Sequence, residues 1–290
     1  MRRVMHTLAD LRRATATGNS TAALYDKVGA TFGTVPLRPF HLGDGGLLGA
    51  LSRGDTAVSA LIARVLDCNM VACKLGMSFE HHARISTCEG KRAWAHMRPG
   101  EVQSMEDGRI LAGVAPSGAP RGDRFVLFEE LRRRSPSDTW PALTTAHGAL
   151  SAVGSAISYQ LEHCTSSSHA LRLTKMSDTF VACFPGDGLG YPSHFDGDEA
   201  CRLTIILYTS TSYRHHHGGC LQMLDEERRC WHEVQPAADT LVIFRSDKVL
   251  HKVEPCFDAP RYALTVFLSD SRAREKAEES ALLASLAFTV

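Results

Sequence analysis

Two histidines and one aspartate occur at a spacing that suits a metal site. His194 and Asp196 are two positions apart, and His251 follows much later in the chain. Side chains two positions apart in an extended strand point to the same face, so His194 and Asp196 can hold one ion while the third ligand comes from elsewhere. Two imidazoles and one carboxylate on one side of a metal leave the opposite positions open, as in non-haem Fe(II) oxygenases that admit a keto acid and O2. The pattern therefore predicts that His194, Asp196 and His251 bind a catalytic Fe(II) ion.

An arginine that follows the last histidine has the chemistry to hold a co-substrate. The guanidinium of Arg261 presents a planar fork of donors that matches a carboxylate, such as the far end of 2-oxoglutarate. In the predicted strand that begins at Arg261, the small residues Ala263 and Thr265 share its face and leave space beside it. Tyr208 lies on the same face of another predicted strand as Thr204, so its hydroxyl can donate to the same carboxylate. An ordinary interfacial tyrosine is the alternative interpretation of Tyr208.

The second half of the chain has the pattern of a β-rich fold. From Asp178 onward, short β-branched and aromatic runs are separated by Gly, Pro and Asp clusters. The predicted strands are Thr179–Phe184, Pro192–Phe195, Arg202–Tyr208, Cys220–Leu224, Thr240–Phe244, Val249–Val253 and Arg261–Leu268. Their number and spacing are typical of a jelly-roll or barrel, whose ends can hold a ligand. We therefore expect an α+β fold in which N-terminal helices support a double-stranded β-helix, or jelly-roll, core.

The sequence predicts two helices before these strands. Asp55 can cap a helix whose apolar residues recur at intervals of three and four from Val58 to Leu66. A second helix has the same spacing from Leu150 to Leu161 and ends before the serines at 166–168. We expect both helices to pack on the sheet as supports.

Three regions are expected along the chain. Residues 14–54 are rich in Gly, Ser, Thr and Pro and show no sustained period, so they indicate an extension without a core of its own. We predict an N-terminal extension over residues 1–55 that is poorly ordered or partly helical. A catalytic domain follows over residues 56–276. A helical tail is expected over residues 277–290, because the stretch Ser271–Leu286 has charged residues on one side and leucines on the other.

The composition excludes several classes of partner. The chain of 290 residues has 32 basic and 32 acidic side chains, so no bulk field attracts nucleic acid or anionic lipid. It contains no apolar run long enough to span a bilayer and no secretory signal pattern. Nine cysteines without repeated Cys-x-x-Cys spacing indicate reduced thiols in a reducing compartment. We expect a cytoplasmic or nuclear monomer, and mitochondrial targeting by the Arg-rich first twenty residues is the weaker alternative.

The same metal ligands also occur in protein classes other than the oxygenases. Zinc also accepts two histidines and one carboxylate, so a metal hydrolase or a non-catalytic jelly-roll binding protein uses the same ligands. Arg261 disfavours the hydrolase, because a water-activating zinc needs no fixed clamp for a dicarboxylate. The run His215–His217 precedes two glycines in a predicted loop, and we interpret it as a solvated turn rather than a second metal site.

Several separated motifs, in the correct order, resemble one known family. They are Thr179–Gly186, the His194 and Asp196 pair, Gly218–Gly219, Leu241–Asp247, His251–Pro255 and Arg261–Val266, with Arg121–Arg124 upstream. These motifs are similar to those of the Egl-9 type prolyl hydroxylases, the Fe(II)- and 2-oxoglutarate-dependent enzymes that include the oxygen-sensing hydroxylases of hypoxia-inducible factor. The resemblance covers roughly residues 100–276 and leaves residues 1–55 without a counterpart.

The resemblance implies an activity and a role for each matching residue. It implies a dioxygenase that hydroxylates C4 of a proline in a protein substrate while 2-oxoglutarate is decarboxylated to succinate, with O2 as co-substrate and ascorbate as an accessory reductant. His194, Asp196 and His251 would bind iron. The groups that would bind 2-oxoglutarate are Arg261, Tyr208 and Thr265. Those that would position the protein substrate, in a loop that closes over it, are Arg121 and Asp123.

Two departures from the family pattern matter. Phe184 stands where the family often has a tyrosine, so a hydroxyl beside the co-substrate is absent. The interval between His251 and Arg261 is longer than usual, which we interpret as an insertion over Cys256–Pro260 before the strand, because a shift within the strand would turn Arg261 to the wrong face. An oxygenase of the same fold that acts on another residue or on a small molecule is the remaining alternative. The resemblance names neither the protein substrate nor the oxygen affinity.

Overall fold

The computed structural model describes residues 31–103, 110–115, 118–136, 138–163, 171, 173–196 and 201–270. Three expectations lie outside these residues: the Arg-rich first twenty residues, the serines at 166–168 and the helical tail over 277–290. None of the helices that the structure describes combines the length and apolar character that a bilayer-crossing helix needs.

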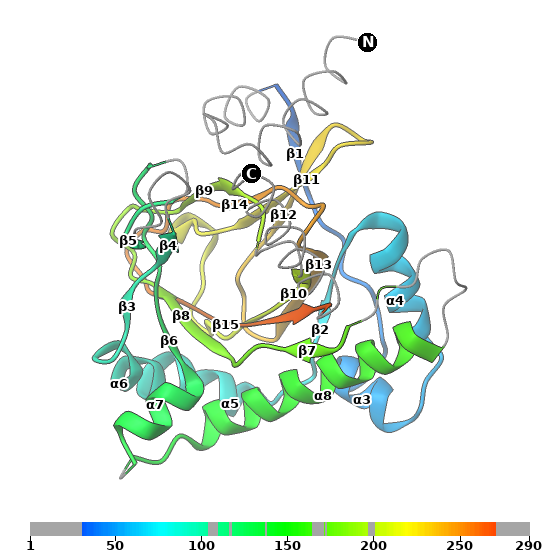
Figure 1. Ribbon diagram of the computed structural model, residues 1–290, viewed down its shortest axis with the longest axis horizontal. Helices are drawn as coiled ribbons and strands as arrows, with labels where there is room; N and C mark the ends of the chain where they lie inside the picture. Colours follow the sequence, from blue (N-terminus) through cyan, green and yellow to red (C-terminus); the bar gives the residue numbers. More distant parts are fainter. Residues whose placement is uncertain are drawn as a thin grey trace, which may run out of the picture.

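Two β-sheets face each other and form the centre of the molecule (Figure 1). The larger sheet has the strand order β2-β13-β10-β15-β8-β6-β3, and β7 pairs with β15 beside this path. Its strands are β2 Met70–Lys74, β3 Arg98–Pro99, β6 Arg124–Leu127, β7 Lys175–Met176, β8 Phe180–Phe184, β10 Cys201–Tyr208, β13 Thr240–Arg245 and β15 Arg261–Ser269. All neighbours on this path pair antiparallel where both partners are described.

The smaller sheet closes the other side of the core. Its order is β1-β12-β11-β14-β9, with antiparallel pairs throughout except the parallel pair β1–β12. Its strands are β1 Gly33–Pro36, β9 Tyr191–His194, β11 Leu221–Asp225, β12 Cys230–Val234 and β14 His251–Val253. A separate hairpin of β4 Glu101–Gln103 and β5 Ile110–Ala112 stands beside it in Figure 1. Two packed antiparallel sheets of this kind are the predicted jelly-roll.

Helices cover the outer side of the larger sheet. They are α3 Gly46–Ser52, α4 Ala57–Cys68, α5 Phe79–Arg84, the π-helix η1 Ile85–Glu89, α6 Gly90–Trp94, α7 Phe128–Arg134 and α8 Pro141–His163. The long helix α8 runs along β15 and β10, and α4 packs on β2 (Figure 1). The two predicted helices are confirmed as α4 and α8. The Asp55 carboxylate accepts a hydrogen bond from the Ala57 N–H at 2.9 Å, which satisfies one free donor at the start of α4.

The alternation of side chains sends the two faces of β10 and β15 into different cores. On β15, Tyr262, Leu264, Val266 and Leu268 join the helix-covered core, whereas Ala263 faces the space between the sheets. On β10, Leu203, Ile205 and Leu207 join the helix-covered core, and Tyr208 faces inward. The predicted inward faces of both strands are therefore confirmed. The inward-facing core is small and carries the polar residues of the site.

The start of the folded unit lies earlier than the predicted boundary after residue 55. Strand β1 pairs with β12, and Leu47 and Ala50 of α3 are buried in the helix-covered core. The composition of residues 14–54 gave no period from which these short elements could be predicted. The structure thus joins residues 33–52 to the same packed core as the domain that follows.

Candidate metal centre and co-substrate pocket

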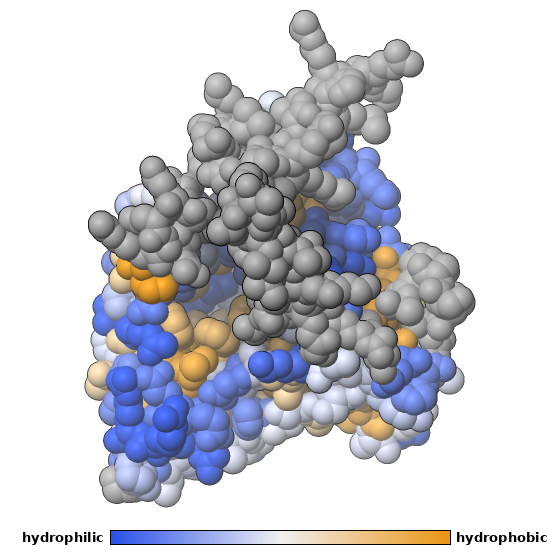
Figure 2. Space-filling view, in the orientation of Figure 1, coloured by the Kyte–Doolittle hydropathy of each residue, from blue (hydrophilic) through white to orange (hydrophobic). Residues whose placement is uncertain are grey.

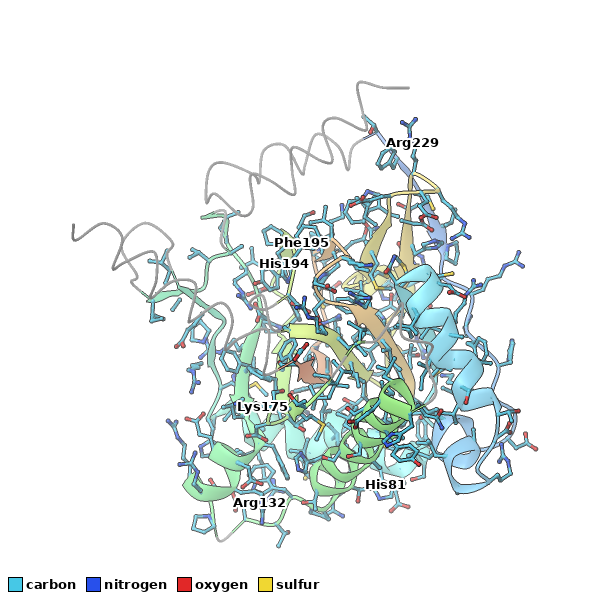
Figure 3. The ribbon with its side chains drawn as sticks, turned by 45° about the vertical axis from the view of Figure 1, so that its right-hand side comes forward. His81, Arg132, Lys175, His194, Phe195 and Arg229 are labelled. Atoms are coloured by element: carbon cyan, nitrogen blue, oxygen red, sulfur yellow. The ribbon has the colours of Figure 1, made fainter. Side chains whose placement is uncertain are left out.

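The three predicted metal ligands converge in the structure. His194 ends β9 and pairs in register with His251 at the start of β14, while Asp196 follows β9 by two residues. The Asp196 Oδ1 atom lies 3.5 Å from His194 Nε2 and 3.4 Å from His251 Nε2. Atoms that bind one ion at bonds of about 2.1 Å lie about 3 to 3.5 Å apart. The three side chains therefore fit one metal ion, and Figure 3 shows His194 at the upper end of the barrel.

Both imidazole rings are held so that the same nitrogen faces the centre. His194 Nδ1 lies 2.8 Å from the Pro192 carbonyl oxygen, and His251 Nδ1 lies 3.1 Å from the Val249 carbonyl oxygen. A carbonyl can only accept, so each Nδ1 carries the proton and each Nε2 offers its lone pair inward. Metal-binding histidines almost always have such an acceptor on the other nitrogen.

The aspartate is oriented by residues that the sequence did not suggest. The Thr204 hydroxyl donates to Asp196 Oδ2 at 2.8 Å and lies 2.8 Å from the Ser246 hydroxyl. With Oδ2 occupied in this way, Oδ1 is left facing the two histidines. A signal for Thr204 existed, because it shares the inward face of β10 with Tyr208. Ser246, which follows β13 in the chain, lies in the Leu241–Asp247 motif, but no role was predicted for it.

The charges of the three residues are coupled. Burial acts to raise the pKa of Asp196, but the neighbouring His251 and His194 outweigh it and hold this pKa well below its ordinary value. Burial acts to lower the pKa of His251, but the Asp196 charge and hydrogen bond raise it above its ordinary value. Burial and the charge of His251 lower the pKa of His194.

The arginine clamp is buried in the space between the sheets. Arg261 is only 4% exposed, and one of its terminal nitrogens donates to the Tyr208 hydroxyl at 3.0 Å. The guanidinium lies over the rings of Phe184 and Tyr208, at 4.8 and 4.7 Å. Its Nε is buried without a partner, and Arg261 forms no ion pair with any residue that the structure describes. A buried cation without an anion requires a ligand, and a carboxylate is the group that fits this fork.

Strand β10 connects the clamp with the metal ligands. Thr204 contacts Asp196, and Tyr208, four residues along the strand, contacts Arg261. Four residues of extended chain span about 13 Å. Thr265 of β15 pairs in register with Ile206, midway between these two contacts. The inward face therefore places Thr265 between the carboxylate clamp and the metal ligands.

The Arg261 side chain also needs space beside its stem. Gly219 has a φ of +69°, and a Cβ added there would lie 3.0 Å from Arg261 Cδ. A side chain at this position would press on the arginine stem and is also disfavoured by the backbone conformation. Phe184, which replaces a tyrosine of the family pattern, supplies a ring face to the guanidinium instead of a hydroxyl. Such stacking stabilises a desolvated cation.

Arg121 and Asp123 lie beside the metal ligands and bind each other. Two guanidinium nitrogens of Arg121 donate to the Asp123 carboxylate, and a third donates to the Tyr191 hydroxyl at 2.7 Å. The Tyr191 ring stacks on the His194 ring with centroids 3.7 Å apart. This chain of contacts connects the Arg121–Arg124 motif with the metal centre. Arg121 and Asp123 are already paired with each other, and they line the site beside Tyr191 and His194.

The run His215–His217 lies apart from this centre. It forms the 3-10 helix η3 between β10 and β11, and none of its three side chains is buried. His217 Nδ1 accepts from the Arg214 N–H at 3.1 Å, which closes the turn. The interpretation as a turn between strands is confirmed.

Comparison with known proteins identifies the class of this site. Residues 179–269 match the model of the 2OG-Fe(II) oxygenase superfamily. This segment spans β8 to β15.

 

The predicted residues inside the matched segment number six in all, and they are His194, Asp196, Tyr208, His251, Arg261 and Thr265. The β core of this chain is therefore similar to that of the 2OG-Fe(II) oxygenase superfamily. The family implies Fe(II), 2-oxoglutarate and O2, and the donor atoms described above fit the first two.

Within that class, the most informative relatives are Egl nine proteins. The chain is 36% identical over 123 residues to rat Egl nine homolog 1, a match that covers 40% of this chain and 36% of the relative. It is 35% identical over 136 residues to human prolyl hydroxylase EGLN3, which covers 45% of this chain and 56% of the relative. The chain thus spans between about a third and just over half of these curated relatives.

Solved structures share the fold. A prolyl hydroxylase from Trichoplax adhaerens, in complex with a peptide of the hypoxia-inducible factor oxygen degradation domain, has a TM-score of 0.60 at 20% identity, covering 78% of this chain and 95% of that one. A Pseudomonas putida prolyl-4-hydroxylase has a TM-score of 0.56 at 21% identity, covering 73% and 99%. These likenesses establish the jelly-roll fold of 2OG-Fe(II) oxygenases.

Proposed function

We propose that this chain is an Fe(II)- and 2-oxoglutarate-dependent dioxygenase that hydroxylates C4 of a proline in a protein substrate. The observation that carries the proposal is the buried, incompletely partnered Arg261 guanidinium on the same inward surface as the three metal ligands. The similarity to Egl nine prolyl hydroxylases supports the choice of proline. A role in oxygen sensing belongs to this proposal and depends on the oxygen affinity.

Each residue has a physical task in this reaction. His194, Asp196 and His251 would hold iron, and Thr204 keeps the aspartate oxygen turned toward it. When bound, iron with 2-oxoglutarate and O2 supplies the oxidising chemistry that couples hydroxylation to the release of succinate and CO2. Arg261 would fix the distal carboxylate of the co-substrate.

The remaining pocket residues would shape the co-substrate and substrate sites. Tyr208 would share the distal carboxylate with Arg261, because its hydroxyl already lies beside the guanidinium. Thr265 would lie along the co-substrate. Arg121 and Asp123 would position the protein substrate by forming the wall next to Tyr191 and His194. The buried setting of these groups limits the access of water, which would otherwise consume the oxidant.

The reaction can be tested with the purified chain. Succinate formation from 2-oxoglutarate should require both added Fe(II) and O2, and His194→Ala should abolish it. The substrate is sought by comparing hydroxyproline in the proteomes of cells that contain the active chain or the His194→Ala variant. Hydroxylation of a residue other than proline would redirect the proposal to another oxygenase target. Equal turnover by the wild type and His194→Ala would refute the assigned centre.

Partners and location extend the proposal. A protein substrate is supported by the Trichoplax adhaerens relative, whose structure contains a peptide. All cysteines that the structure describes are free thiols, which supports a reducing compartment such as the cytoplasm or nucleus. We further propose that the chain acts as a monomer without nucleic acid or membrane. Size-exclusion chromatography and cell fractionation test these statements, and a requirement for ascorbate is tested by omitting it from the assay.

A further inference from the structure

A second group of metal-binding side chains lies at the end of the β11–β12 hairpin. Asp225 ends β11 and pairs in register with Cys230, the first residue of β12. His232 is two positions further along β12 and therefore points to the same face as Cys230. One ligand atom from each of the three residues lies within 4.8 Å of the other two. Figure 3 labels Arg229 in the turn that joins these two strands.

The distances suit a tetrahedral ion with mixed donors. The His232 Nε2 atom lies 3.3 Å from Asp225 Oδ2 and 3.9 Å from Cys230 Sγ. With Zn–N and Zn–O bonds of about 2.0 Å and a Zn–S bond of about 2.3 Å, tetrahedral angles separate N from O by about 3.3 Å and N from S by about 3.6 Å. The first distance already matches, and the second requires only a small movement of the thiol.

An arginine side chain now lies where a cation would bind. The Arg228 guanidinium donates to Asp225 Oδ2 at 2.7 Å. The Arg228 side chain is 60% exposed, whereas that of Asp225 is only 9% exposed. A solvated arginine can turn away at small cost. Its departure would leave the Asp225 carboxylate and the Cys230 thiol open to a cation.

We propose that Asp225, Cys230 and His232 form a second metal site, selective for a borderline cation of the zinc type. The combination of sulfur, nitrogen and oxygen donors distinguishes it from the iron centre, which has no sulfur donor. The two sites share one face of the smaller sheet. Met223 pairs with His232 on one side and with His251 on the other, so two strand spacings, about 10 Å, separate these histidines.

The site should bind its metal reversibly. The Nδ1 atom of His232 is buried without a partner among the described residues, so no acceptor stabilises its proton when Nε2 binds a metal. Loss of such an outer partner typically weakens metal binding by about 10- to 100-fold. We therefore expect an exchangeable metal that follows the supply of the cell.

Cobalt(II) distinguishes the two sites, because only the proposed one contains a thiolate. The full chain is first treated with a chelator, kept reduced with a phosphine, and titrated with Co(II). We expect a near-ultraviolet thiolate-to-cobalt charge-transfer band and, by native mass spectrometry, two metal ions per chain. The His194→Ala variant should keep the band and bind one ion. Absence of the band from the wild type would overturn the proposal.

Variants assign the band to the hairpin. Cys230→Ser should abolish it, and His232→Ala should weaken Co(II) binding by at least about tenfold. Cys88→Ser is the matched control, because Cys88 is an exposed thiol elsewhere in the chain and the band should persist. Arg228→Gln should strengthen binding by removing the competing cation, which also reports on the site when a ligand variant folds poorly. Persistence of the band in Cys230→Ser, with unchanged affinity in Arg228→Gln, would refute the site.

Discussion

Arg261 is a charged side chain that is almost fully removed from water, and its closest polar partner is a neutral phenol. A carboxylate is therefore the ligand that completes this site. We predict that Arg261→Ala raises the 2-oxoglutarate concentration needed for half-maximal succinate formation by about 30-fold or more, because loss of a buried charged contact costs about 2–5 kcal/mol. Steady-state kinetics with varied 2-oxoglutarate measures this change. Iron affinity should stay the same, since Arg261 contacts none of the three ligands.

Tyr208→Phe provides a smaller change at the same position in the pocket. It removes one neutral hydrogen bond from Arg261 and keeps the ring on which the guanidinium lies. A hydrogen bond of this type contributes about 1 kcal/mol, so the requirement for 2-oxoglutarate should rise about fivefold to tenfold. An effect as large as that of Arg261→Ala would mean that Tyr208 binds the co-substrate in some other way.

The acidity of the metal ligands predicts how metal binding depends on pH. His251 has a raised pKa and must lose its proton to bind metal, whereas Asp196 has a lowered pKa and remains ionised. As pH falls through the raised pKa of His251, a proton competes with the metal, so metal affinity decreases. Titration of Mn(II) between neutral and mildly acidic pH measures this. Affinity that is constant across the pKa of His251 would contradict its role as a ligand.

The side chains that touch the ligands could be predicted from the sequence only in part. His194, Asp196 and Arg261 could be predicted from the sequence. Their side-chain types suit a metal and a carboxylate ligand, and the alternation of side chains along a strand indicates which face they share. The role of Ser246 could not be predicted, because its contact with Thr204 depends on where the end of β13 lies beside β10. Register between strands distant in the chain leaves no local pattern.

Strand β10 carries one residue for the metal end of the site and one for the clamp. Thr204→Val keeps the shape of the side chain but removes the donor that holds Asp196 Oδ2. We expect metal affinity to fall by about tenfold, because outer partners of metal ligands contribute about 10- to 100-fold. Thr204→Ser keeps the hydroxyl and should restore most of the affinity. Calorimetry with Mn(II) measures both variants, and an unchanged Thr204→Val would show that Asp196 needs no such support.

The long helix α8 begins on a buried carboxylate. Glu89, the last residue of η1, is fully buried and accepts from the Ala142 and Leu143 N–H groups at the start of α8. Its charge also favours the positive end of the helix. We predict that Glu89→Gln lowers the free energy of unfolding by about 2 kcal/mol. Urea denaturation measures this, and Glu129→Gln, at an exposed surface pair, is a control that should change stability by less than about 0.5 kcal/mol.

At the scale of elements, the sequence predicted those with a regular pattern. Strands β8, β10, β13 and β15 and helix α4 were expected with nearly correct bounds, whereas α8 was expected from Leu150 and begins at Pro141. Strand β12 was missed because its sequence, Cys-Trp-His-Glu-Val, contains no run of β-branched residues. The segment α5–η1–α6 was missed because its π-helical turn interrupts the helical period.

For the molecule as a whole, the predicted jelly-roll fold class was right. The predicted N-terminal limit of the folded domain, after residue 55, lay too far along the chain. Strand β1 is exposed along its length and is held by parallel pairing with β12, more than 190 residues later in the chain. An exposed, four-residue strand has no apolar face to reveal it. The limit of a domain that is completed by such a distant pair is set by tertiary contacts, which periodicity does not report.

Binding of metal and co-substrate should stabilise the whole fold, because their ligands come from both sheets. Arg261 lies in the larger sheet and His194 and His251 lie in the smaller one. At 100 times its dissociation constant a ligand stabilises the folded state by about 2.7 kcal/mol, which for a domain of this size raises Tm by about 5 °C or more. Differential scanning fluorimetry with Mn(II) and 2-oxoglutarate should show this rise, and a chelator should reverse it. Arg261→Ala should keep the rise caused by Mn(II) and lose the further rise caused by 2-oxoglutarate. If 2-oxoglutarate stabilises that variant as much as the wild type, the co-substrate binds elsewhere and the clamp is wrongly assigned.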